Sequence, residues 1–214
     1  MAKHGVDALG VSLNEVEPML ATAANGLPRS GDWSYEVKYD GYRLLASRNQ
    51  MRTRNGADAT RWFPELMPYL ASLAGSDHII DGEVCVLDEF GRSDFNRLHA
   101  RAARRGWYAG ADPVVLCAFD LLVHSGEDIR QAPIEERKRR LQELLHGYTH
   151  GLLFVASHDD GDALYRMVVS VKAEGVVAKR AGSKYVAGRS ADWRKIVRPG
   201  AKKAGAFARD DIGA

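Results

Sequence analysis

Residues 36–43 read Glu36-Val37-Lys38-Tyr39-Asp40-Gly41-Tyr42-Arg43, which contains the spacing K-x-D-G-x-R. From Tyr35 to Asp40, aromatic or aliphatic residues alternate with charged residues. This two-residue period is typical of a β-strand, and it directs the three charged side chains to one face and the apolar ones to a core. Gly41 is expected to end the strand. The pattern therefore predicts a strand that presents a lysine just before a turn.

Lys38 is a candidate nucleophile toward a nucleotide. An attacking amine must be neutral, and neighbouring cations or a metal ion favour the neutral form. The alternative for Lys38 taken alone is a half-exposed hairpin with a charged outer face. A nucleotide site requires more charged groups from elsewhere in the chain, so the other segments discriminate between these interpretations.

Four further segments have the composition of strands, namely residues 79–87, 114–122, 174–180 and 193–198. Asp81-Gly82-Glu83 interrupts the first segment, and its carboxylates are costly to bury unless they meet a metal ion, a sugar hydroxyl or a cation. Asp81 could instead only cap its turn. The last two segments supply Lys179 and Lys195. Lysines, arginines and two or three carboxylates together suit a polyphosphate bound with a divalent cation.

In their order along the chain, these patterns resemble the nucleotidyltransferase motifs of ATP-dependent DNA ligases, especially the ligase domain of bacterial ligase-D-type enzymes. The motifs are K-x-D-G-x-R, R-N-G, D-G-E, F-D-L-L, E-G-V-V-A-K and W-x-K. The resemblance implies an α+β fold of two antiparallel sheets packed together with flanking helices, a nucleotidyltransferase or ATP-grasp-like adenylation domain. It covers residues 17–198, and leaves residues 1–16 as a lead-in and residues 199–214 as a tail. An oligonucleotide-binding barrel is not expected within this length.

The resemblance implies a ligase that uses ATP with Mg²⁺ or Mn²⁺ to seal nicked double-stranded DNA. The lack of a long apolar run or a signal-like amino terminus predicts a cytoplasmic location. Lys38 would attack the α-phosphorus of ATP, expel pyrophosphate and carry AMP. The AMP would pass to the 5′-phosphate at the nick, and the 3′-hydroxyl would then displace it. A separate barrel protein or DNA-repair protein could be a further partner. Two alternatives stay open: a nucleotidyltransferase for RNA ends, and a ligase-derived binding module that does not turn over.

The resemblance also implies which residues hold the nucleotide. Glu36 and the backbone of Val37 would recognise adenine, and Phe119 would stack on the base. Taken alone, Phe119 lies in an apolar run and is equally suited to the core. Arg43 and Arg54 would bind the sugar or the phosphates and later the 5′-phosphate of DNA.

The remaining motif residues would serve the metal ion and the phosphates. Glu83 would hold the ribose or a metal ion, Glu174 would serve the divalent ion, and Lys179 and Lys195 would contact the α-phosphate. Glu174 and Lys179 are five residues apart, so strict alternation puts them on opposite faces unless the strand begins after Glu174 or contains a bulge. The family usually has a second lysine where Val197 stands, so one phosphate contact could be missing or supplied differently.

Apolar spacing predicts helices within residues 64–73, 133–145 and 163–171, with the run Arg137–Arg140 facing solvent. Basic and aromatic residues cluster in 97–108, where they could contact DNA phosphates or form solvated surface.

Composition sets the remaining bounds. A net charge of +2 over 214 residues excludes a uniformly basic DNA-wrapping surface. The two cysteines have no metal-binding spacing and are expected to be buried small hydrophobes, and the seven histidines show no zinc pattern. No run of apolar residues approaches the roughly 18 needed to span a membrane, so no membrane partner is expected.

Overall fold

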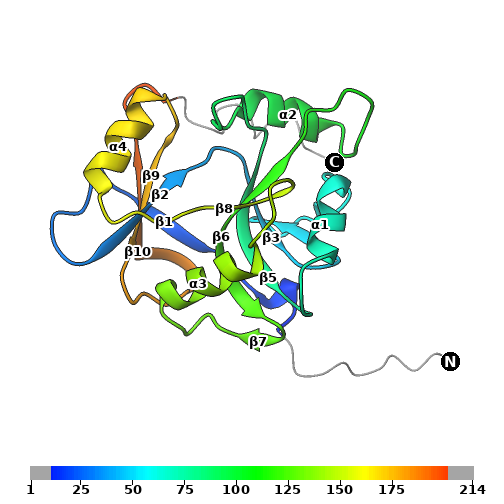
Figure 1. Cartoon of the computed structure of the whole chain (residues 1–214), viewed down its shortest axis with the longest axis horizontal. Helices are drawn as coiled ribbons and strands as arrows, with labels where there is room; N and C mark the ends of the chain where they lie inside the picture. The colour runs from blue at the N-terminus through cyan, green and yellow to red at the C-terminus, as the bar shows by residue number, and fades with distance from the viewer. Residues whose placement is uncertain (1–10, 202–214) are drawn as a thin grey trace.

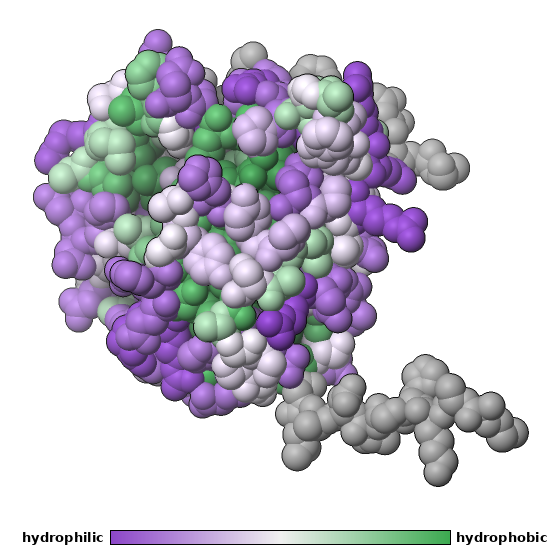
Figure 2. All heavy atoms as spheres, turned by 45° about the vertical axis from the view of Figure 1, so that its right-hand side comes forward, coloured by the Kyte–Doolittle hydropathy of each residue, from purple (hydrophilic) through white to green (hydrophobic). Residues whose placement is uncertain are grey.

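The computed structural model describes residues 11–201 (Figure 1). Two β-sheets stand beside each other in the middle, and the α-helices lie at the outside of these sheets. Hydrophobic atoms at the surface lie mostly in recesses between hydrophilic side chains (Figure 2). The predicted α+β fold with two sheets and flanking helices is confirmed.

The first sheet has the strand order β1-β10-β9-β2. Its members are β1 (Met19–Ala23), β2 (Trp33–Lys38), β9 (Gly175–Arg180) and β10 (Gly188–Val197). β9 runs antiparallel to both of its neighbours, whereas β1 pairs with β10 in parallel. β2 is last in the order, and at its outer edge it forms an isolated bridge between Tyr35 and His158.

The second sheet has the order β4-β3-β5-β6-β7, and β8 pairs with β6. Its members are β3 (Tyr42–Ala46), β4 (Met51–Thr53), β5 (Ile79–Cys85), β6 (Val115–His124), β7 (Glu127–Asp128) and β8 (Leu152–Phe154). β6 and β8 are parallel. The prediction of purely antiparallel sheets is therefore wrong for one strand pair in each sheet. Parallel strands need a crossover, and a helix supplies it between β6 and β8.

The α-helices are α1 (Met67–Ala71), α2 (Phe95–Ala103), α3 (Ile134–Leu144) and α4 (Gly161–Ser170), with 3₁₀ turns η1 (Leu13–Glu15) and η2 (Pro64–Leu66). They confirm the three helices predicted from apolar spacing. α3 is the crossover between β6 and β8, and α4 packs on β2 and β9. None of the helices within residues 11–201 has the length and apolar character to cross a bilayer.

Packing against α4 fixes the two faces of β2. Tyr35 and Val37 contact the cluster of Leu164 and Val168 on α4. The opposite face, which carries Glu36 and Lys38, is turned toward the space between the sheets. Glu36 is only 2% exposed, so the alternative of a charged outer hairpin face is wrong.

The boundary of the N-terminal lead-in differs from the prediction. Ser12 caps η1 with its side chain and backbone, and Leu13 and Val16 are buried with Met19 of β1. Residues 13–16 therefore belong to the folded unit, because two apolar side chains find a place in the core there. The remaining lead-in up to residue 10 and the tail from residue 202 lie outside the described residues.

The solvent-facing run predicted on α3 is wrong for its first two members. Arg137 is fully buried and Lys138 is 6% exposed. Together with Ile134 and Leu141, they occupy positions i, i+3, i+4 and i+7, which form one stripe of a helix. Arg137 Nε and Nη2 donate to the carboxylate of Asp120 on β6 at 2.8 and 2.9 Å. A carboxylate from a distant part of the chain thus allows a cation to occupy the buried face of the helix.

The basic and aromatic residues of 97–108 form α2 and the turn after it. Arg101 is not solvated: its guanidinium is buried, pairs with Glu65 at 2.7 Å and donates to the carbonyl oxygens of Trp62 and Gly106. Arg104 stacks on the Tyr108 ring, with 4.1 Å between the guanidinium carbon and the ring centroid. Part of this cluster therefore holds the fold together, and part remains at the surface.

The cysteines are free and buried, as expected. Cys85 on β5 and Cys117 on β6 pack in one small cluster with Val155. Burial, followed by the neighbouring Cys117, raises the pKa of the Cys85 thiol well above its usual value. A raised pKa makes this thiol unreactive.

Replacing Asp120 with alanine is expected to lower the free energy of unfolding by about 3–5 kcal/mol, because the buried Arg137 guanidinium loses its counter-charge. Urea denaturation followed by circular dichroism measures this change. Arg139→Ala is the matched control, since its side chain is 54% exposed and its ion pairs lie in solvent. The control should cost less than about 1 kcal/mol. Similar losses for both variants would contradict the role of the buried pair.

Candidate active site

Lys38 ends β2 and lies beside a carboxylate from β9's N-terminal end. Its Nζ is 2.5 Å from Glu174 Oε2, and the two side chains are 21% and 11% exposed. β9 begins at Gly175, which is opposite Lys38 in the register. The strand therefore begins after Glu174, as one of the two predicted alternatives required. Because Glu174 precedes the strand, its side chain does not follow the strand's alternation of faces. It therefore reaches the same side as Lys38.

Two further carboxylates lie close to Lys38. Burial raises the pKa of Asp40 to about 6, with the charge of Glu174 adding to the effect. Burial also raises the pKa of Glu83 to about 7, against the opposing influence of Lys38 and Arg43. The raised values reflect mainly the removal of these carboxyl groups from water, and Glu174 adds to both shifts. Carboxylate oxygens are the ligands that Mg²⁺ and Mn²⁺ prefer, so these residues fit a divalent cation.

No set of three or more His, Cys, Asp and Glu side chains arranged to hold a metal ion occurs within residues 11–201. A cation beside Glu174 and Glu83 would therefore need oxygen ligands from a nucleotide or from water as well.

Gly41 allows the turn after Lys38 to approach β5. A Cβ atom at this position would lie 2.1 Å from the carbonyl oxygen of Val84. A side chain there would force the turn, and Asp40 with it, away from the strand that carries Glu83. The Asp-Gly pair of the motif thus has a steric reason.

Arg43 on β3 is held in place by Asp81. Its Nε and Nη2 donate to the two Asp81 oxygens at 2.7 and 2.5 Å, and Nη2 also donates to the Met19 carbonyl oxygen at 2.8 Å. Tyr185 donates its hydroxyl to Asp81 at 2.6 Å. Asp81 is fully buried within β5, so the interpretation as a turn cap is wrong. The guanidinium lies over the ring of Phe119, 4.8 Å from its centroid.

Glu36 lies between two buried lysines. Lys138 Nζ is 2.9 Å from Oε1, which also accepts from Ser157 Oγ at 3.1 Å. Lys179 Nζ is 2.8 Å from Oε2. Burial would raise the pKa of Glu36, but the two ammonium groups outweigh it and hold the pKa below its usual value. Sequence reasoning missed Lys138 because its run of basic residues is typical of a solvated helix face.

Lys179 lies at the Glu36 end of this face. Its ammonium donates to the Phe119 carbonyl oxygen at 2.9 Å and lies 4.3 Å from the centroid of the Trp193 ring. In the β2–β9 register it is opposite Ser34, whereas Lys38 is opposite Gly175. The structure thus brings Lys179 to the base-reading candidates rather than directly to Lys38.

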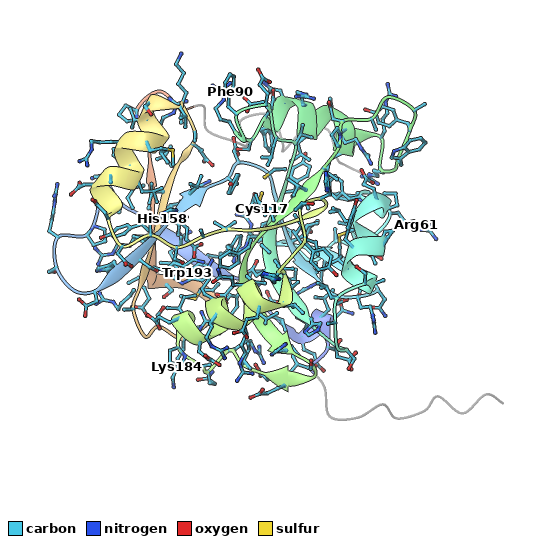
Figure 3. All side chains as sticks on the ribbon, viewed as in Figure 1. Arg61, Phe90, Cys117, His158, Lys184 and Trp193 are labelled. Atoms are coloured by element: carbon cyan, nitrogen blue, oxygen red, sulfur yellow. The ribbon has the colours of Figure 1, made fainter. Side chains whose placement is uncertain are left out.

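Phe119 and Trp193 are neighbours between the sheets. Their rings meet edge to face with centroids 6.1 Å apart. Trp193 is 2% exposed and packs in the core, whereas Phe119 is only half-buried. In Figure 3, Trp193 and Cys117 lie in the middle of the molecule and Lys184 lies at its periphery. Phe119 therefore keeps some exposed surface, and both Arg43 and Lys179 lie over its ring, 4.8 and 4.9 Å from the centroid.

The backbone of Val37 faces the outer edge of β2. Tyr35 exchanges backbone hydrogen bonds with His158 at this edge, at 2.9 and 2.8 Å. Residues two apart in a strand direct their N–H and C=O groups to the same edge. The backbone groups of Val37 therefore point to the edge at which Tyr35 bonds to His158. These groups are available next to Glu36.

The remaining site candidates border the same region. Arg54 is exposed, and its backbone N–H donates to the Arg43 carbonyl oxygen at 3.1 Å. Lys195 is opposite Val177, which is opposite Glu36. Directly opposed residues share a face, so Lys195 lies on the face of Glu36 and Lys38.

Position 197 is the departure from the motif pattern. Val197 is opposite Gly175, and Gly175 is opposite Lys38. An apolar side chain thus occupies the row of Lys38. Arg198 does not replace the missing cation, because its guanidinium donates to the carbonyl oxygens of Ala173 and Lys172.

Comparison with known proteins identifies the family of this arrangement. A family model for the ATP dependent DNA ligase domain matches residues 18–196. The multifunctional non-homologous end joining protein LigD of Pseudomonas aeruginosa is 40% identical over 188 residues, covering 85% of this chain and 22% of that protein. The bifunctional LigD of Bacillus subtilis is 31% identical over 207 residues, covering 84% of this chain and 33% of that protein. The chain thus spans about a fifth to a third of these relatives.

Solved structures agree. The crystal structure of the ligase domain of M. tuberculosis LigD has a TM-score of 0.73 at 31% identity, covering 86% of this chain and 60% of that chain. A mycobacterial DNA ligase D complexed with ATP and MES has a TM-score of 0.73 at 32% identity, covering 88% and 62%. Chlorella virus DNA ligase-adenylate, at 17% identity and a TM-score of 0.66, supports the fold alone. The chain belongs to the ATP-dependent DNA ligase domain family, with a ligase domain of the LigD type.

Proposed function

We propose that this chain joins nicks in double-stranded DNA through a covalent AMP carried on Lys38. The observation that supports this most directly is the inner face of β2, where Glu36 and Lys38 lie two residues apart. Glu36 pairs with Lys179, and Lys179 donates to the carbonyl oxygen of the half-buried Phe119. Lys38 lies next to the carboxylates of Glu174 and Glu83. A nucleotide can therefore place its base at one end of this face and its α-phosphate at the other.

In the first step, a bond forms between Lys38 Nζ and the α-phosphorus as the bond to pyrophosphate breaks, and the amine gives up a proton. Lys38 Nζ is ion-paired with Glu174, and an amine attacks only in its neutral form. The released proton passes to water. Mg²⁺ or Mn²⁺, held by Glu174 and Glu83, would neutralise acidic charge there and at the departing pyrophosphate. Glu174 would then release the amine for attack.

At the base end, Glu36 and the Val37 backbone would read adenine, with Phe119 stacked on the ring. Arg43 is preoriented by Asp81 for the sugar or the phosphates, and Arg54 adds a cation at the rim. Lys195 would neutralise the α-phosphate. Lys179 would reach it only by leaving Glu36 and the Phe119 carbonyl.

The later steps transfer AMP to DNA. The 5′-phosphate at the nick would take AMP from Lys38, and the 3′-hydroxyl would then displace AMP to seal the strand. The relatives' names include non-homologous end joining, and we propose a role in DNA repair in the cytoplasm for this chain. A separate oligonucleotide-binding barrel or another repair protein would be a partner.

Lys38→Ala is expected to abolish transfer of acid-labile label from α-labelled ATP to the protein, because Lys38 is the amine that pairs with Glu174 within residues 11–201. Scintillation counting of acid-precipitated, gel-resolved protein measures this transfer. Lys184→Ala is the matched control and should retain wild-type labelling, since Lys184 is an exposed lysine at the periphery (Figure 3). Wild-type labelling of Lys38→Ala would show that the nucleophile is a different residue.

Phe119→Ala is expected to weaken ATP binding by about 1–3 kcal/mol through lost burial and stacking. Isothermal titration calorimetry with a non-hydrolysable ATP analogue measures the change. Phe90→Ala is the control, because Phe90 is 70% exposed in the turn before α2 and should leave the affinity unchanged. ATP should also label the wild type much more strongly than GTP does. Equal labelling would favour a guanylyltransferase.

The 214-residue chain by itself is expected to seal a pre-adenylated nick faster than it completes the reaction from ATP. The final step needs mainly a metal ion and local phosphate contacts, whereas the full reaction adds nucleotide binding and pyrophosphate release. Both rates should fall steeply between roughly 50 and 200 mM salt, because phosphate contacts dominate DNA binding. Single-turnover sealing of both substrates measures this.

Equal and salt-insensitive rates would contradict this expectation. Sealing of nicked RNA in preference to nicked DNA would assign the chain to RNA ends, and the absence of sealing on either substrate would indicate a binding module.

A further inference from the structure

Lys138 has no part in the steps proposed above, yet it contacts the residue that would read the base. It projects from α3, where its ammonium pairs with Glu36 at 2.9 Å, donates to the Val155 carbonyl oxygen and lies 4.5 Å from the centroid of the Phe154 ring. The residue is 6% exposed. It is thus a buried cation on a helix whose other basic residues, apart from Arg137, reach solvent.

The two oxygens of Glu36 have different partners. Oε1 accepts from Lys138 and from Ser157 Oγ, so it is fixed against α3 and the segment after β8. Oε2 has Lys179 as its protein partner within residues 11–201, and Lys179 also bonds to the Phe119 carbonyl oxygen. A carboxylate oxygen has two lone-pair positions. Oε2 therefore keeps one acceptor position for a further donor.

Charge balance does not explain why Lys138 is a cation. Lys138 and Lys179 bring two positive charges to the single carboxylate of Glu36, and all three residues are at most 6% exposed. Burial lowers the pKa of Lys179 to about 8, with the charge of Lys138 adding to the effect and Glu36 opposing it. One lysine would suffice to neutralise Glu36. A surplus buried cation is unfavourable for folding, which points to another use for it.

We propose that Lys138 is a positioning residue that holds Glu36 as an ionised, fixed acceptor and thereby makes the site select 6-aminopurine over 6-oxopurine nucleotides. The proposal rests on the proposed function, in which Glu36 reads the base. An ionised carboxylate accepts a hydrogen bond from the 6-amino group of adenine. The 6-oxo group of hypoxanthine offers an acceptor instead, so it meets another acceptor and is rejected.

Loss of Lys138 would weaken this selection in two ways. Oε1 would lose its charged partner, so the carboxyl group could rotate about its last bond. With only Lys179 left to offset burial, Glu36 would also be protonated more readily and could then donate to a 6-oxo group. Removing Lys138 leaves a balanced Glu36–Lys179 pair, so the fold is expected to survive.

A cavity beside Lys138 allows a second test, in which an added amine replaces the lysine. Its volume is about 340 Å³, and its wall includes Lys138, Ser157, Phe154 and Ser34. Lys138 and Ser157, the two partners of Glu36 Oε1, both line this cavity, whereas Lys38 does not. A small primary alkylammonium ion can therefore enter the space left by a truncated Lys138 and restore a cation at Oε1.

The test compares the dissociation constants of ATP and ITP, which differ at the purine 6-position, by calorimetry on the 214-residue chain. Lys138→Met is expected to reduce the ATP:ITP preference by about 10- to 100-fold, the value of a hydrogen bond to a charged group. Arg139→Met is the matched control: Arg139 also lines the cavity, but it pairs with Glu136 and Glu143 rather than with Glu36, so the wild-type ratio should be kept. Lys138→Ala should regain part of the preference when propylammonium is added, and Arg139→Ala should not respond.

The outcomes separate base reading by Glu36 from the role of Lys138. Equal binding of ATP and ITP by the wild type would overturn base reading by Glu36 and, with it, the role of Lys138. Loss of the preference in Glu36→Gln but not in folded Lys138→Met would overturn the role of Lys138 alone. Thermal melts confirm folding of each variant, and if Lys138→Met does not fold, the propylammonium response of Lys138→Ala decides the question. An unchanged ratio with and without propylammonium would overturn the proposal.

Discussion

The burial of charge on the inner face of β2 constrains the rest of the structure. Glu36 is 2% exposed, and a carboxylate in such a place requires partners that replace water. The partners come from three other parts of the chain: Lys138 on α3, Lys179 on β9 and Ser157 after β8. One carboxyl group thus links β2 to α3, β9 and the segment after β8.

α3 shows how far this constraint reaches. Two successive residues of the helix are bound to different sheets, because Arg137 pairs with Asp120 on β6 and Lys138 pairs with Glu36 on β2. Neighbouring residues on a helix point about 100° apart, so both bonds can form only if α3 lies across the junction of the sheets. The helix thus ties together the two walls between which a nucleotide would lie.

Most of the first sheet's site-bearing face could be predicted from the sequence, and less of the second sheet could. Alternation from Tyr35 to Lys38 was sufficient to place Glu36 and Lys38 on one face, and the break in alternation at Glu174 was visible in the spacing. The parallel pairs involving β1 and β8 were not visible, because short strands have little periodic signal and their partners are remote in sequence. The inward turn of Lys138 was hidden for a related reason. A lysine in a basic run indicates solvent until a carboxylate far away in the sequence, here Glu36, is known to lie beside it.

The bonds around Arg43 have a mechanical consequence. Arg43 belongs to the second sheet, but its guanidinium bonds to Met19 on β1 of the first sheet. Its partner Asp81 on β5 accepts from Tyr185, which precedes β10. The hydrogen bonds of Arg43 and Asp81 thus join the two sheets at one compact cluster. Any breathing motion that widens the space between the sheets is therefore expected to be smallest near Arg43 and near α3, which also joins the sheets, and to grow with distance from both.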